Sequence, residues 1–86
     1  MDTDEVEAIV NAVRPLLAGK SSPIQGAALA DLLAIWLAGH FATGNQRATA
    51  AIRERLLKEH IETVRKLIPL NEEAILLGHY GPVRAQ

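Results

Sequence analysis

The side chains best suited to chemistry in this chain are three histidines and one isolated carboxylate. Between Pro15 and Gly44 the only charged residues are Lys20 and Asp31, so Asp31 has no second acid or base nearby in its own segment. A carboxylate that acts as a general acid or base needs such a partner. The histidines also lack the Glu-x-x-His and His-Glu-x-x-His spacings of metal-binding helices. We therefore expect no catalytic residue, no metal site and no cofactor.

Two of the polar residues fall on a stripe that recurs at heptad spacing. The stripe consists of Arg53, Leu57, His60, Val64 and Leu67. Polar residues in such a seam fix register and partner choice at some cost in stability. We hypothesise that Asp31 pairs with Arg53 or His60, either within one chain or between two copies. The alternative, an acid–base site, would need Asp31 and a histidine to meet in a pocket.

The composition indicates one small, all-α domain. The chain has 86 residues, of which 49% are hydrophobic and 22% charged, so it is too apolar for an intrinsically disordered protein. Fourteen alanines and twelve leucines favour helices, whereas strands prefer β-branched and aromatic residues. A net charge of −1 creates no overall field that attracts nucleic acid, and the absence of cysteine excludes disulfides and thiolate sites. We expect a helical domain over residues 1–78 and a flexible tail over residues 79–86.

Apolar periodicity predicts a first helix over residues 3–18. Asp2 and Glu5 are spaced as a capping pair, and their charges suit a helix N-terminus. Pro15 interrupts the pattern because it removes one backbone hydrogen bond. It should either kink this helix or end it near Val13.

A second helix is expected over residues 22–42. Ser22, Pro23 and Gln25 match a capping box with proline at the first helical position. Gly39 would cost about 1 kcal/mol relative to alanine, so an earlier end is an alternative. Near the end of this helix His40 would be a cation at a helix C-terminus.

A third helix is expected from about residue 46 to Ile68, capped by Thr43 or Asn45 and stopped by Pro69. A short fourth helix should follow over residues 72–77 and end at Gly78. The predicted fold is therefore a small bundle of three main helices and a short C-terminal one.

The second helix is apolar on almost every side, which requires neighbours on every side. The chain supplies too few helices for this, whereas a symmetric dimer supplies them. We therefore expect a homodimer with the second helix near the two-fold axis. The residues expected to face the second copy are Gly26, Ala30, Leu33, Ala34, Leu37 and Ala38.

Because the sequence contains no catalytic or metal-binding motif, it favours a non-enzymatic module that binds itself or another protein. The alternative is a nucleic-acid regulator that uses the basic residues of the third helix. Residues 46–66 contain six basic and three acidic side chains, and the interspersed acids are typical of a solvated face rather than a DNA-reading one. Residues 23–43 are long enough to raise the question of a membrane span, but Asp31 would lie near its centre. An acidic N-terminus does not resemble a secretory signal, so we expect a cytoplasmic protein.

Overall fold

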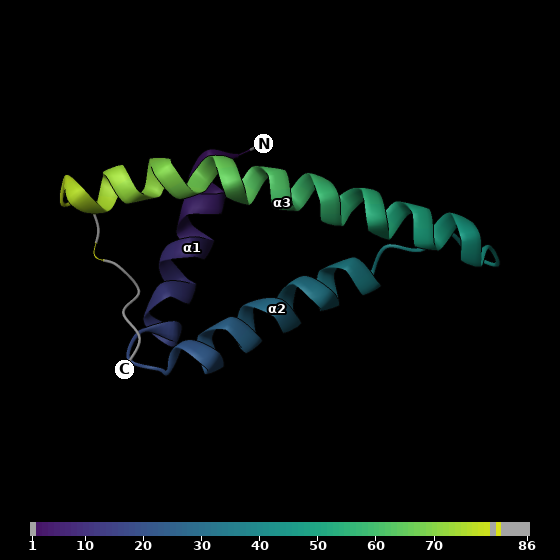
Figure 1. Ribbon diagram of the computed structural model, residues 1–86, viewed down its shortest axis with the longest axis horizontal. Helices are drawn as coiled ribbons and strands as arrows, with labels where there is room; N and C mark the ends of the chain where they lie inside the picture. Colours follow the sequence, from purple (N-terminus) through teal and green to yellow (C-terminus); the bar gives the residue numbers. More distant parts are fainter. Residues whose placement is uncertain (1, 80, 82–86) are drawn as a thin grey trace. The chain divides into compact units, whose positions relative to one another are not determined.

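The computed structural model describes residues 2–79 and 81, and every regular element among them is a helix (Figure 1). The helices are α1 (Thr3–Leu17), α2 (Ser22–Ala38) and α3 (Gln46–Leu76). The prediction of an all-α chain is confirmed. The contacts group into two compact units, one with α1 and the start of α2 up to Leu29, the other spanning Ala30–Gly81. The tail expected over residues 79–86 lies mostly outside the described residues.

Helix α1 begins as its sequence predicts, because the Asp2 carboxylate accepts a hydrogen bond from the Glu5 amide at 3.1 Å. Pro15 lies inside the helix, which continues to Leu17. Of the two alternatives, an end near Val13 is therefore wrong. A proline in the last turn removes a single backbone hydrogen bond, so the helix can finish that turn. Gly19 then adopts φ +80°, a conformation that favours glycine.

Helix α2 begins at Ser22, and its cap lies one residue earlier than predicted. Ser21, not Ser22, is the cap: its hydroxyl accepts from the Ile24 amide at 3.4 Å and its carbonyl from the Gln25 amide at 2.9 Å. The Gln25 side chain donates to the Leu17 carbonyl at 2.8 Å. That bond ties the last turn of α1 to the first turns of α2, within the first unit.

Helix α2 ends at Ala38, four residues before the predicted end at residue 42. Gly39 and His40 leave the helix in tight turns, with amides that donate to the Ile35 carbonyl at 3.2 Å and the Leu37 carbonyl at 3.0 Å. Glycine has the highest backbone entropy to lose in a helix, so an end here costs less than elsewhere.

Helix α3 begins at the cap that the sequence allowed, since the Asn45 side chain accepts from the Ala48 amide at 2.9 Å. Its end was predicted wrongly. Pro69 lies inside a continuous helix that reaches Leu76, so there is no stop at Ile68 and no separate fourth helix among the described residues. A proline removes one hydrogen bond from a helix interior, and good helix formers on both sides can carry the helix past it.

Gly78, which was expected to end a separate fourth helix, follows the end of α3 and has φ +78°. Its amide donates to the Ile75 carbonyl at 3.0 Å, and the His79 amide donates to the Ala74 carbonyl at 3.0 Å. This pair of bonds is the Schellman motif, in which the left-handed residue satisfies the last carbonyls of a helix.

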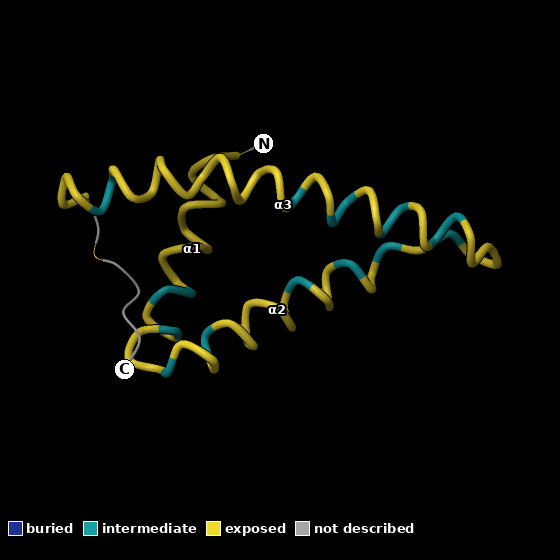
Figure 2. The backbone as a smooth tube through the Cα atoms, viewed as in Figure 1, coloured by how far each residue is buried: buried dark blue, intermediate teal, exposed yellow. Residues whose placement is uncertain are grey.

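Not one described residue is fully buried (Figure 2). In the second unit the stretches of α2 and α3 next to their loop face each other with partly buried positions (Figure 2). These helix positions include Leu33, Leu37, Ile52, Leu56 and Leu57. Large apolar side chains are widely exposed, with Ile35 at 62% and Ile68 at 58%. Among the described residues, none of the helices has the length and apolar character of a membrane span.

Candidate functional site

The C-terminus of α2 is held by the side chain of Arg53, which lies in the second turn of α3 and is partly buried. Its Nε donates to the carbonyls of Leu37 at 3.2 Å and His40 at 3.1 Å, and its Nη2 donates to the Ala38 carbonyl at 2.9 Å. The last carbonyls of a helix lack intrahelical partners and carry partial negative charge. The guanidinium therefore both satisfies and neutralises the end of α2.

Thr49 closes the loop between the two helices. Its hydroxyl accepts from the Ala42 amide at 3.0 Å and lies 3.2 Å from the Ala42 carbonyl and 2.9 Å from the Asn45 carbonyl. Thr49 and Arg53 are four residues apart and therefore lie on the same side of α3. Together they fix where the chain leaves α2 and where it enters α3.

The single tryptophan lies between two histidines. The Trp36 ring meets the His40 ring edge-on with centroids 5.1 Å apart, and the His60 ring at 5.8 Å with the planes tilted by 46°. His40 Nδ1 also lies 2.7 Å from the Trp36 carbonyl. Ring pairs at these separations add modest stability beyond the area that they bury. The cluster therefore joins α2 to the middle of α3.

The structure places the predicted polar residues in different roles. Arg53 and His60 lie on the side of α3 that meets α2, where Arg53 bonds to backbone carbonyls and His60 contacts Trp36. Asp31 is exposed, and no ion pair of Asp31 is seen within residues 2–79 and 81. A pair between Asp31 and either base in an assembled dimer stays a prediction.

One sign in the sequence could have revealed the role of Arg53. The last turn of α2 contains no basic residue, so nothing in the helix itself balances its C-terminal carbonyls. A cation from another segment is one way to balance them, and Arg53 is the basic residue of the heptad stripe.

The residues predicted to face a second copy divide into two groups. Leu33 and Leu37 are partly buried. The small residues of the set are exposed, namely Gly26, Ala30, Ala34 and Ala38. Around Gly26 there is open space, because a Cβ built there would have nothing within 4 Å. The small-residue line of α2 is therefore available to a neighbour.

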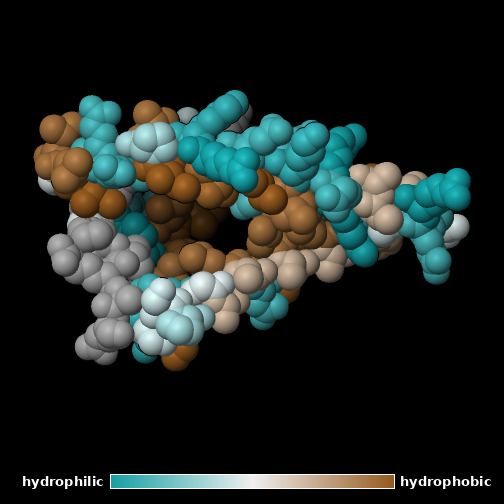
Figure 3. Space-filling view, viewed as in Figure 1, coloured by the Kyte–Doolittle hydropathy of each residue, from teal (hydrophilic) through white to brown (hydrophobic). Residues whose placement is uncertain are grey.

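The heptad stripe of α3 continues well beyond the part that α2 covers. We use the name α3 strip for Arg53, Leu57, His60, Val64, Leu67, Asn71 and Ala74. Its first three members are partly buried, whereas all residues from 61 to 73 are exposed. Charged side chains line one side of α3 and apolar ones the other (Figure 3). In this half of the strip the apolar side chains of Val64 and Leu67 are exposed.

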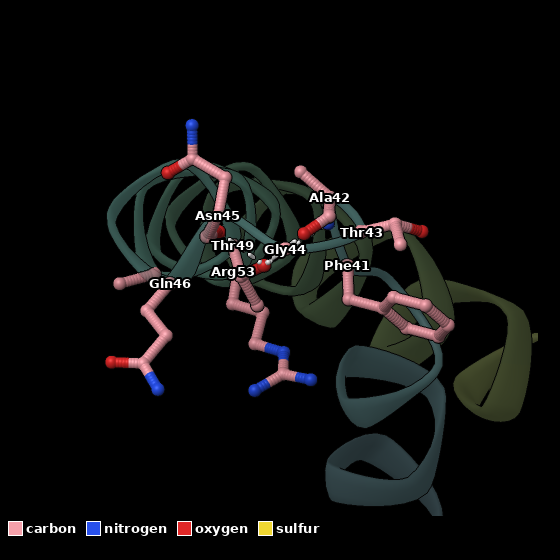
Figure 4. A pocket seen from close by; sticks show the side chains of 9 residues that line it. Phe41, Ala42, Thr43, Gly44, Asn45, Gln46, Thr49 and Arg53 are labelled. Carbon is pink, nitrogen blue, oxygen red and sulfur yellow. Dashed lines mark hydrogen bonds between the residues drawn. The ribbon is translucent and has the colours of Figure 1, made fainter.

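An open hollow lies beside the loop that joins α2 to α3 (Figure 4). Phe41, Asn45, Thr49 and Arg53 contribute to its lining. The three polar side chains among them already bond to backbone groups. These three side chains therefore serve the closure of the loop.

Comparison with protein-family models, with curated proteins and with solved structures gives no match to this chain. Within the described residues, no three histidine, cysteine or acidic side chains come together as a metal site would require. The function must therefore be argued from the exposed helix faces themselves.

Proposed function

We propose that this chain is a non-enzymatic helical module that associates with itself and serves as a protein interaction or scaffold unit. The observation that carries the proposal is the combination of no buried residue with seventeen large apolar side chains exposed among the described residues. Burial of apolar surface supplies most of the free energy that stabilises a folded chain. Contact with a second protein surface would bury these exposed apolar side chains, which is why their exposure supports an interaction module.

The position of the exposed side chains supports this proposal. Single exposed leucines are ordinary on any protein, but contiguous apolar patches mark interaction surfaces. On α2 the exposed side chains include Leu32, Ile35 and Trp36, and on α3 they include Val64 and Leu67. They lie along helix faces, which is how helices bury one another in bundles.

The basic residues of α3 fit a solvated surface. Arg55 Nε lies 3.9 Å from Glu59 Oε1, one turn further along the helix, and both side chains are about two-thirds exposed. Acids alternate with bases along this side, which weakens its attraction for phosphates.

Light scattering during size-exclusion chromatography, with sedimentation equilibrium, tests the proposal over about 1–100 µM, the range in which moderately stable dimers dissociate. We expect an oligomer whose melting temperature rises with concentration, because assembly stabilises the folded state by mass action. A monomer that melts cooperatively at a temperature independent of concentration would overturn the proposal.

A further inference from the structure

We draw no further inference here: the strongest candidate, the apolar surface patch around Val64 and Leu67 on the exposed half of the α3 strip, carries no proposal, because nothing in the structure shows what covers it.

Discussion

The two halves of α3 have the same heptad pattern and different surroundings. In the first half, Leu57 and His60 are partly buried where α2 faces them. In the second half, Val64 and Leu67 occupy equivalent positions and are exposed. The second unit contains α2 only from Ala30 to Ala38, and the contacts of this part with α3 reach Arg53 and His60. A heptad stripe therefore predicts that a partner exists, but the tertiary structure decides which part of the stripe is covered.

In α2, unlike α3, the sequence pattern does not predict which face of the helix is covered. Its sequence has no polar side, so nothing in its pattern distinguishes the face that meets α3 from the others. The structure selects the side of Leu33 and Leu37, and leaves Leu32 and Ile35 exposed at 55% and 62%. The apolar faces that remain are the ones that a neighbour has to cover.

Removal of the Arg53 side chain should lower the free energy of unfolding the most, because this side chain attaches the end of α2 to the covered half of α3. Arg53→Ala loses three hydrogen bonds to the carbonyls of Leu37, Ala38 and His40. We expect the free energy of unfolding in urea to fall by about 2–3 kcal/mol, in line with hydrogen bonds from a charged donor. Arg53→Lys keeps the charge but not the fork of donors and should lose about half as much. Equal stability of both variants and the wild type would show that the cap is not needed.

A matched pair of leucine truncations compares the two halves directly. Leu57→Ala removes partly buried contacts within one chain and should cost about 2 kcal/mol at every protein concentration. Leu67→Ala lies in the exposed half, so its cost should appear mainly at concentrations where the copies associate. Urea unfolding at two protein concentrations about a hundredfold apart measures both effects. If the two variants respond alike to concentration, the distinction between the halves fails.

Replacement of Pro69 tests whether α3 is continuous in its exposed half. Pro69 leaves the carbonyl one turn earlier in α3 without its backbone donor. Pro69→Ala should restore that bond and raise the free energy of unfolding by about 1 kcal/mol, part of the gain being offset by a more flexible unfolded chain. Helix content from circular dichroism should rise slightly. Reduced helix content in the variant would contradict a continuous α3.

The smallest effect is expected at the exposed ion pair of Arg55 and Glu59, which lies away from the strip. The two groups are 3.9 Å apart and both are well exposed, so water and salt screen their attraction. Arg55→Ala should change the free energy of unfolding by less than about 0.5 kcal/mol. A loss as large as that of Leu57→Ala would show that this side of α3 is also in contact with something.

Local sequence signals predicted the starts of α1 and α3 and the glycine that follows the last helical turn. Asp2 and Asn45 cap their helices because their short side chains reach amides three residues on, and Gly78 accepts a left-handed conformation that other residues avoid. Prolines were misleading, because Pro15 and Pro69 both lie within helices. A single missing hydrogen bond is a local cost, and the neighbouring residues of a long helix can outweigh it.

The candidate site was predicted only in part, because the sequence pattern identified residues of the site but not their partners. The heptad spacing identified Arg53 and His60 as polar residues on an apolar seam, and both lie on the side of α3 that faces α2. Their partners are a set of backbone carbonyls and the ring of Trp36, which the heptad spacing does not reveal. Backbone groups are present at every residue, so the ones left without partners become known only when the helix end is known.

Composition and spacing alone determine that this chain is helical and where most of its helices begin. They also predict that its helices have more apolar surface than one copy of the chain can cover. These properties depend on interactions within a few residues of each position. The tertiary structure decided which side of α2 meets α3, that Arg53 closes the end of α2, and that the strip beyond His60 stays open. Those outcomes depend on helix lengths and on groups far apart in the chain, whose meeting is governed by packing geometry rather than by local preference.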